Sequence, residues 1–308
     1  MRRVLITGSN GLLGQKLLDL YLERREAQLI ATSRGANRYP GMEGYGYTYQ
    51  SMDVSNRDEV MLNILRYCPT AVINTAAMTN VDACEQNKEE CEKLNVEAVK
   101  YLVEGCNMYD IQLIHLSTDF IFDGAAGPYS EDATPNPLSY YGESKLRAEQ
   151  YIIENCKSYA ILRTVLVYGV ASDMSRSNIV LWVKNSLEQG KPIKVVSDQF
   201  RTPTLAEDLA VGCYLAEKNN AQGVFNISGR DFMNVYELAV RVADFWKLDS
   251  SLIEKTDSSG FTQPAKRPLR TGFTLSKSRD ALGYEPRSFE EGLALMDKQL
   301  NKPVPTFV

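Results

Sequence analysis

Three side chains near the middle of the sequence could together deliver a proton to a carbonyl oxygen. The segment YYGESK places Tyr140 and Tyr141 five and four residues before Lys145, and Thr118 ends the apolar run IQLIHLST. If a helix begins near Tyr140, Tyr141 and Lys145 share one face, whereas Tyr140 pairs with Ser144 on another. The pKa of a free phenol is about 10, and a nearby ammonium group, together with the positive charge of an oxidised nicotinamide, is expected to lower it. Tyr141, Lys145 and Thr118 are therefore the candidate catalytic set for ketone reduction, with Tyr141 as acid and Thr118 as hydrogen-bond donor to the oxygen.

A glycine-rich turn near the N-terminus predicts the cofactor site. Gly8, Gly11 and Gly14 are spaced by three residues, after an apolar strand and at the start of a helical pattern. Gly8 would allow the tight turn, Gly11 the approach of a pyrophosphate, and Gly14 close packing of the helix on the sheet. The alternative is an ordinary strand-to-helix turn, which the strand–turn–helix context disfavours. The predicted cofactor turn comprises Gly8, Ser9, Asn10, Gly11, Leu12, Leu13 and Gly14.

The end of the second predicted strand favours NADPH, with NADH as a possible substitute. The sequence there is TSRGANR, with Ser33 and Arg34 and no carboxylate to bind the ribose 2′-hydroxyl or to repel a 2′-phosphate. The alternative is that Arg34 and Arg38 only face solvent. Asp53, followed by Val54, ends the next strand and could accept a hydrogen bond from the adenine amino group.

Apolar strands alternate with amphipathic helices and predict the fold. This alternation is typical of right-handed βαβ units, so we expect an α/β Rossmann-type doubly wound parallel sheet. Residues 1–169 would form the dinucleotide-binding domain and 170–308 mainly a smaller substrate-binding lobe, with about 205–228 returning to the sheet. Strands are expected at 3–8, 27–33, 47–53, 70–77, 111–118, 159–169 and 224–229. Helices are expected at 11–25, 55–68 with Ser55 as N-cap, about 86–108, from about 140, and 234–246.

Composition excludes several other classes of protein. The chain has 308 residues and a net charge of −5, which argues against nucleic-acid binding, and no apolar run is long enough to cross a membrane. The single histidine, His115, excludes a multi-histidine metal site, and we expect no metal; we interpret it as a packed strand residue. The six cysteines form no CxxC pair, so reduced thiols in a cytoplasmic protein are the simplest interpretation.

Eight segments distributed along the chain have the character of family motifs: GSNGLLG, NTAAMTNVDACE, LNVEA, HLSTDFIFDG, YGESKLRAE, LRTVLVYG, DQFRTPT and RPLRTGFTLSK. On these segments the whole chain resembles the extended short-chain dehydrogenase/reductases, and within them the dTDP-4-dehydrorhamnose reductases. This resemblance implies NADPH-dependent reduction of the 4-keto group of dTDP-4-dehydro-L-rhamnose, with a nucleotide sugar as substrate and a possible homodimer. Two alternatives stay open: another nucleotide-sugar reductase or epimerase, and a non-catalytic NADP-binding subunit similar to the β subunit of methionine adenosyltransferase.

The resemblance also implies roles for individual residues. Thr118, Tyr141 and Lys145 would be catalytic, and Asn95 would support the lysine through the backbone and water. Leu166 stands where some members carry a sugar-contacting tryptophan, which leaves the exact sugar open. Arg201 and Arg267 would neutralise the diphosphate, although each could instead form a surface ion pair. The nicotinamide end of the cofactor would contact Ala76, Ala77 and Thr79. The candidate substrate residues are Thr118, Asp119, Leu166, Asn178, Arg201 and Arg267.

Overall fold

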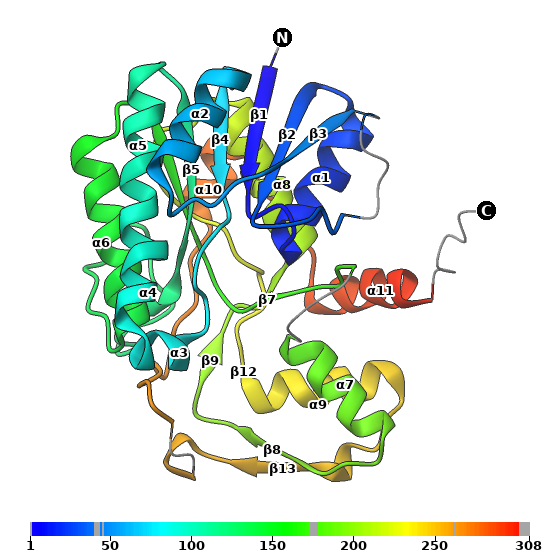
Figure 1. The fold of residues 1–308 in the computed structure, drawn as a ribbon. Coiled ribbons are helices and arrows are strands. Elements are labelled where there is room, and N and C mark those ends of the chain that lie inside the picture. The colour runs from blue at the N-terminus through cyan, green and yellow to red at the C-terminus, as the bar shows by residue number, and fades with distance from the viewer. Residues whose placement is uncertain (1, 40–43, 45, 173–177, 261–262, 302–308) are drawn as a thin grey trace.

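The main body of the protein is a seven-stranded sheet in which all neighbouring strands run parallel (Figure 1). The computed structural model describes residues 2–39, 44, 46–172, 178–260 and 263–301. The strand order reverses direction between β1 and β4, so the predicted doubly wound Rossmann-type fold is confirmed. In spatial order the strands are β11 (Gly223–Asn226), β6 (Tyr159–Thr164), β5 (Gln112–Thr118), β4 (Ala71–Asn74), β1 (Arg2–Thr7), β2 (Ala27–Ser33) and β3 (Tyr47–Ser51).

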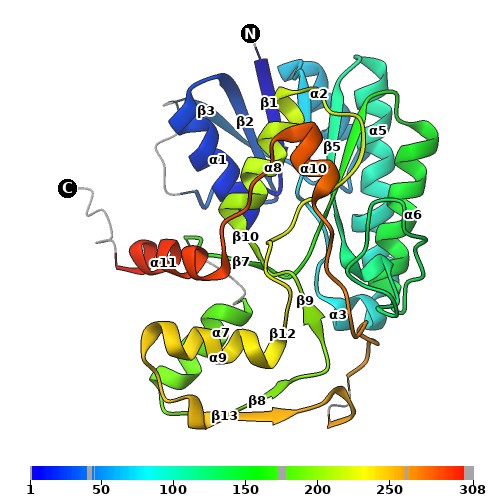
Figure 2. The ribbon, with the colours of Figure 1, turned by 180° about the vertical axis from the view of Figure 1, so that it is seen from behind.

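Helices cover both faces of this sheet, which explains why its strands are apolar along most of their length. Within β1, Val4 and Ile6 pack into the core on one face, and Leu5 packs into the core on the other. From behind, α8 and α10 lie across the sheet (Figure 2). The first face is covered by α1 (Leu12–Arg24) and α8 (Ala206–Lys218), with α10 (Ser276–Leu282) beside α8 and β11. The second face is covered by α2 (Arg57–Tyr67), α5 (Ala98–Met108) and α6 (Tyr140–Asn155).

Two predicted helices differ from the structure in detail. The helix expected over 86–108 is divided into α4, a π-helical turn and α5, after a separate short helix α3. The N-cap of α2 is Asn56 rather than Ser55, because the Asn56 side chain accepts hydrogen bonds from the backbone N–H groups of the first turn. Ser55 Oγ instead donates to Asp53 Oδ1 at 2.7 Å. The additional elements here are α3 (Val81–Gln86), α4 (Lys88–Glu92) and the π-helical turn η1 (Lys93–Glu97).

A smaller lobe with its own apolar core lies beyond the carboxyl ends of the strands (Figure 1). Its short sheet pairs β8 with β13 in parallel. No helix in the described part of the chain is both long and apolar enough to span a membrane. The lobe and its connections contain β7 (Val167–Tyr168), α7 (Ile179–Glu188), β8 (Ile193–Val196), β9 (Phe200–Arg201), β10 (Thr204–Leu205), β12 (Met233–Asn234), α9 (Val235–Trp246), η3 (Ser250–Leu252), β13 (Ile253–Thr256), η4 (Ser258–Gly260) and α11 (Phe289–Leu300).

A buried ion pair connects α6, which carries the candidate catalytic residues, to β6. The Arg163 guanidinium donates to both carboxylate oxygens of Glu149, with Nη2 to Oε2 at 2.7 Å and Nε to Oε1 at 3.1 Å. Nη1 also donates to the Glu131 carbonyl at 2.9 Å. Because both charges are buried, each depends on the other for compensation.

Arg163→Met is therefore expected to lower the free energy of unfolding by about 3–5 kcal/mol, because it leaves the Glu149 carboxylate buried without its cation. Urea unfolding monitored by circular dichroism measures this loss. The double variant Arg163→Met/Glu149→Met removes both charges and should recover much of the stability. An equal or larger loss in the double variant would show that the pair acts through packing rather than charge.

Candidate active site

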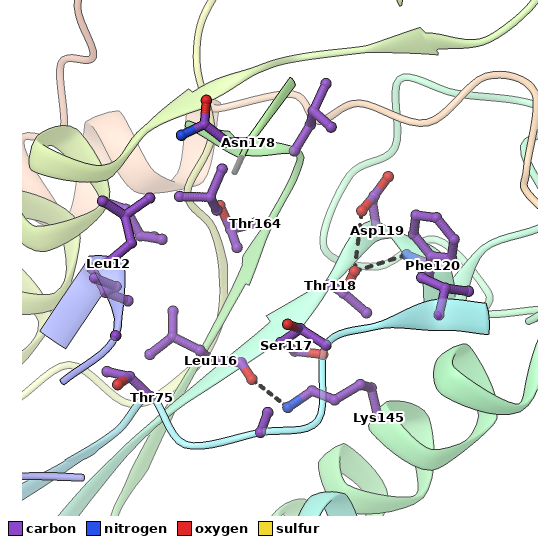
Figure 3. A pocket seen from close by; sticks show the side chains of 18 of the residues that line it. Leu12, Thr75, Leu116, Ser117, Thr118, Asp119, Phe120, Lys145, Thr164 and Asn178 are labelled. Atoms are coloured by element: carbon purple, nitrogen blue, oxygen red, sulfur yellow. Dashed lines mark hydrogen bonds between the residues drawn. The ribbon is translucent and has the colours of Figure 1, made fainter. Parts of the chain in front are cut away.

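A cavity of about 580 Å³ opens at the carboxyl ends of the strands, between the sheet and the smaller lobe (Figure 3). The turn after β1, the segment after β4, the end of β5 and the start of α6 form its wall on the sheet side. This is the position where ligands bind in open α/β sheets. Thirteen residues predicted from the sequence line it: Asn10, Gly11, Leu12, Leu13, Ala77, Thr79, Thr118, Asp119, Tyr141, Lys145, Leu166, Asn178 and Arg201.

The remaining predicted residues are not among the described residues that line the cavity. Four of them belong to the turns around the cavity: Gly8, Ser9, Gly14 and Ala76. A second group lies at or just after the carboxyl ends of β2 and β3. That second group is Ser33, Arg34, Asp53 and Val54; Arg267 is discussed below.

Other lining residues were missed because most are small or apolar and resemble core residues in the sequence. The missed set is Thr75, Val81, Leu116, Ser117, Phe120, Thr164, Val167, Ala171, Ile179 and Leu209. Ser117 had a usable signal, since it directly precedes the candidate catalytic threonine. Its Oγ is buried without a hydrogen-bond partner among the described residues, as expected for a group that meets a ligand.

The glycine turn has the shape that a dinucleotide requires. Gly8 has a φ of +65°, and a Cβ there would lie 2.8 Å from Thr75 Oγ1 and 2.9 Å from the Ala76 nitrogen. A Cβ on Gly14 would lie 2.5 Å from the Gly8 carbonyl oxygen. The first turn of α1 has no side-chain N-cap, and Ser9 Oγ is buried without a partner in the described part of the chain. These donors and this close backbone fit a pyrophosphate at the helix N-terminus.

The turn is tied to the end of β2, where the 2′-phosphate of NADPH would lie. Asn10 Nδ2 donates to the Ala36 carbonyl at 2.9 Å, and Asn10 Oδ1 accepts from the Arg38 backbone N–H at 2.9 Å. The side chains of Arg34 and Arg38 are exposed. Hydrogen bonds from Ser55, and the charge of Arg34, lower the pKa of the partly buried Asp53, although desolvation opposes this shift. Arg34 and Asp53 are therefore neighbours at this edge.

Only one of the two adjacent tyrosines faces the cavity. Tyr141 is 8% exposed and lines the cavity, and its ring packs edge-on against Phe120 with centroids 5.8 Å apart. Tyr140 is turned toward α4, where its hydroxyl donates to Glu92 Oε2 at 3.0 Å. The helical spacing therefore separated the two tyrosines correctly.

The pKa of Tyr141 differs from the expectation based on Lys145. Burial raises it above its usual value, a hydrogen bond with Thr118 opposes this shift, and the negative charge of Asp119 adds to it. Lys145 alone does not lower the pKa of Tyr141 in this structure, because desolvation of the phenolate is the largest effect. Tyr141 therefore holds its proton firmly at neutral pH. The lowering by an oxidised cofactor stays a prediction.

Lys145 is held by β5 rather than by the tyrosine one turn earlier. Nζ donates to the Leu116 carbonyl at 2.6 Å, as Figure 3 shows, and lies 3.0 Å from His115 Nε2. Burial lowers the pKa of Lys145 to about 8, and the charge of Glu149 opposes this shift. The side chain is 2% exposed but still reaches the cavity wall.

Thr118 and Asp119 form a buried polar group (Figure 3), and Tyr141 lines the same cavity. Thr118 Oγ1 donates to Asp119 Oδ1 at 3.1 Å and accepts from the Phe120 backbone N–H at 3.2 Å, at the start of the short helix η2 (Asp119–Ile121). Thr271 Oγ1 donates to Asp119 Oδ2, and the Arg201 guanidinium lies 3.7 Å from the same oxygen. Burial raises the pKa of Asp119, while Arg201 opposes that shift.

The two arginines expected to bind the diphosphate form hydrogen bonds or an ion pair with other residues of the protein. Arg201 is 4% exposed and donates to the carbonyls of Phe200 and Pro268, both at 2.8 Å. Arg267 forms a two-pronged ion pair with Asp82, with distances of 2.7 and 3.2 Å, and is not among the described lining residues. The alternative interpretation of Arg267 as an ion-pair residue therefore describes this structure better. Contact of either residue with a diphosphate stays a prediction that requires an exchange of partners.

Asn95 and Leu166 also have definite surroundings. Asn95 Oδ1 accepts from the Met78 backbone N–H at 2.8 Å, and its Nδ2 donates to Ser144 Oγ at 3.1 Å. It therefore fixes the segment after β4 against α6. Its support of Lys145 through the backbone and water stays a prediction. Leu166 lines the cavity with a φ of +41°, a left-handed conformation that is uncommon for leucine.

The comparisons with known proteins agree with this geometry. Residues 1–302 match the family described as RmlD substrate binding domain. The chain belongs to this family. The predicted resemblance to the extended short-chain dehydrogenase/reductases is thereby confirmed.

Proteins that resemble the chain over most of its length carry different names. A dTDP-4-dehydrorhamnose reductase from Aggregatibacter actinomycetemcomitans is 28% identical over 95% of this chain and 97% of its own length. The methionine adenosyltransferase 2 subunit beta of Bos taurus is 32% identical over 93% of this chain and 84% of its own length. A crystal structure of a dTDP-4-dehydrorhamnose reductase from Clostridium acetobutylicum has a TM-score of 0.86 at 26% identity, and the match covers 98% of this chain and 100% of that one.

Gly8 and Gly35 allow a matched test of the turn. Both have positive φ, +65° and +76°, but a Cβ on Gly35 would meet no atom within 4 Å. Gly35→Ala should cost about 1 kcal/mol of unfolding free energy through backbone conformation alone, whereas Gly8→Ala should cost at least about 2 kcal/mol because the methyl group also collides with the segment after β4. Chemical unfolding of both variants measures the difference, and equal losses would contradict the close approach.

Proposed function

We propose that the protein reduces the keto group of a nucleotide-linked sugar with a nicotinamide cofactor, specifically the 4-keto group of dTDP-4-dehydro-L-rhamnose with NADPH. The observation that carries this proposal is the meeting of Tyr141, Lys145 and Thr118 at one cavity that is continuous with the glycine turn. The 28% identity to a named dTDP-4-dehydrorhamnose reductase over nearly the full length supports the choice of sugar nucleotide. The dimer predicted from the resemblance is part of the same proposal.

The side chains supply the proton and the polarisation in this reaction. Tyr141 donates its phenolic proton to the carbonyl oxygen, and the Thr118 hydroxyl turns from Asp119 to hydrogen-bond the same oxygen. Lys145 is a cation at neutral pH that stabilises the phenolate left behind. The reduced nicotinamide, when bound, supplies the hydride to the carbonyl carbon. Ketone, hydride and proton together give the alcohol, and Tyr141 is reloaded from solvent.

The cofactor preference follows from the end of β2. The exposed guanidinium groups of Arg34 and Arg38 can approach a 2′-phosphate, and Ser33 can donate to it. No acidic side chain ends this strand, so β2 itself contributes no carboxylate that would repel the phosphate. NADH lacks this phosphate and is the weaker cofactor in the proposal.

A second candidate function is supported by the 32% identity to a methionine adenosyltransferase β subunit. In that case the protein binds NADP without turning over a sugar nucleotide and acts on a catalytic partner. The substrate assay distinguishes the two. Consumption of NADPH with dTDP-4-dehydro-L-rhamnose supports the reductase. Tight NADPH binding without consumption, together with co-elution with a methionine adenosyltransferase catalytic subunit, supports the second candidate.

Tyr141→Phe is expected to lower kcat by a factor of at least about 100, because the proton donor is lost, while the Kd for NADPH changes little. Tyr140→Phe is the matched control, since it removes the same atom from the neighbouring ring that faces Glu92. NADPH absorbance at saturating substrate and cofactor titration by fluorescence provide the two readouts. Loss of turnover in Tyr140→Phe with retention in Tyr141→Phe would reverse the assignment.

Arg34→Ala should weaken NADPH binding by roughly tenfold and leave NADH binding nearly unchanged, since only NADPH carries the 2′-phosphate. Titration of the purified variant with each cofactor measures the two dissociation constants. Arg66→Ala, in an exposed arginine of α2, controls for the loss of one surface charge. Equal weakening of both cofactors by Arg34→Ala would contradict the proposed preference.

A further inference from the structure

The ammonium group of Lys145 has an unusual neighbour, the only histidine of the chain. His115 Nε2 lies 3.0 Å from Lys145 Nζ, and the ring is 1% exposed. Neither the catalytic set nor the cofactor site includes this residue. The sequence predicted a packed strand residue, and its burial agrees with that prediction. Packing alone does not explain why its ring contacts the candidate catalytic lysine.

The contact is the last member of a polar row that crosses three adjacent strands. Thr7 of β1, Asn74 of β4 and His115 of β5 are in register. Thr7 Oγ1 lies 2.6 Å from Asn74 Oδ1, and Asn74 Nδ2 lies 3.1 Å from His115 Nδ1. Thr7 directly precedes the glycine turn, and its Oγ1 accepts from the Ala76 backbone N–H at 3.3 Å. The row therefore runs from the cofactor turn to Lys145.

Two proton arrangements satisfy this row. If Lys145 is an ammonium ion, Nζ donates to a lone pair on His115 Nε2, and the ring proton is on Nδ1, where the amide oxygen of Asn74 can accept it. If Lys145 is a neutral amine, Nε2–H donates to Nζ, and Nδ1 accepts from the Asn74 amide nitrogen. The Asn74 amide can turn between these states because the Thr7 hydroxyl can either donate or accept. The second arrangement has one proton fewer than the first.

We propose that His115 is a positioning residue that holds Lys145 in place in both of its protonation states, with its neutral ring changing tautomer as the lysine gains or loses a proton. This inference rests on the proposed function, because it assigns His115 to the proton supply of that same site. Without such a partner, one of the two states would leave a buried nitrogen unpaired, which costs free energy. Burial and the charge of Lys145 hold the pKa of His115 well below 6.5, so the ring stays neutral.

Several other ionisable groups face Lys145, and their titration has to be distinguished from the change proposed for His115 and Lys145. Glu149 lies one turn further along α6 and is bound by Arg163. Cys91 of α4 also faces it, and a hydrogen bond from Cys84 lowers the pKa of Cys91 to about 7. Tyr141 lines the same cavity but holds its proton at neutral pH. Cys91 is therefore the group whose titration could imitate that of Lys145.

Nitrogen-15 NMR of the histidine-labelled full-length protein tests the tautomer change without any substrate. Because there is one histidine, every ring signal belongs to His115. The expected spectrum at pH 6.5 shows protonated Nδ1 and unprotonated Nε2, and it changes toward the opposite tautomer as the pH rises through about 8. The change should persist in Cys91→Ser and disappear in Lys145→Met. A wild-type spectrum that is constant from pH 6 to pH 10, or a ring that protonates near pH 6.5, overturns the proposal.

Kinetics test the consequence for the reaction. If protonated Lys145 is required, kcat/KM falls as the pH rises through about 8. His115→Met removes the histidine partner from both protonation states of Lys145. Because the charge-assisted hydrogen bond of the ammonium ion is the stronger of the two, this fall should move to lower pH by about one unit, a tenfold loss of proton affinity. His115→Gln keeps an amide that can accept or donate, and it should restore the wild-type profile. A profile in folded His115→Met that matches wild type overturns the proposal.

The two experiments fail independently. If the tautomer changes with pH but the protein never consumes NADPH, the inference about the His115–Lys145 contact stands and the proposed function is rejected. Turnover without a tautomer change would retain the function and reject the role of His115. If His115→Met does not fold, the NMR comparison of wild type with Lys145→Met still decides.

Discussion

The active-site geometry depends on one buried cation. Lys145 projects from α6 onto β5, where water cannot solvate its charge, so its N–H groups must find acceptors inside the protein. The Leu116 carbonyl and the His115 ring meet this requirement. Because both partners belong to one strand, they fix how α6 lies against β5. The same registration brings Tyr141, one turn earlier on α6, to Thr118, two residues beyond Leu116.

The buried positive charge of Lys145 opposes folding at neutral pH. Burial lowers the pKa of Lys145 to about 8 from an ordinary value near 10.5, so the unfolded chain binds the proton more tightly than the native protein. Stability linked to this group therefore rises with pH between about 8 and 10.5, and the charged form at neutral pH is a cost to the fold. The Arg163–Glu149 pair lies close to it, since the Glu149 charge favours the ammonium form. A cation kept at such a cost is more consistent with a chemical role than with structural stabilisation.

The sequence was sufficient for elements whose signal is local. Hydrophobic runs located β2 at its observed bounds and β1 and β5 to within one residue, and the i to i+4 rule separated Tyr141 from Tyr140. Contacts between distant segments could not be predicted in this way. Arg201 donates hydrogen bonds to the carbonyls of Pro268 and Leu269, which lie 67 and 68 positions further along the chain. Asp82 binds Arg267 across 185 positions. The row of Thr7, Asn74 and His115 likewise becomes visible only when strand register is known, because each residue alone resembles a polar residue in an apolar strand.

The raised pKa of Tyr141 determines which protonation state of the phenol is present before reaction. A phenol that releases its proton easily would serve as the base of an alcohol oxidation, whereas a phenol that retains it is loaded as an acid. Burial and the neighbouring Asp119 charge raise the pKa of Tyr141, so Tyr141 retains its proton. Transfer of its proton to a carbonyl becomes favourable only when that oxygen gains negative charge, which occurs as hydride arrives. In the proposed reaction, the cation of Lys145 would stabilise the phenolate, and an oxidised cofactor, when bound, would supply further positive charge. The electrostatics of the site thus keep Tyr141 in the protonated form that the proposed reduction requires.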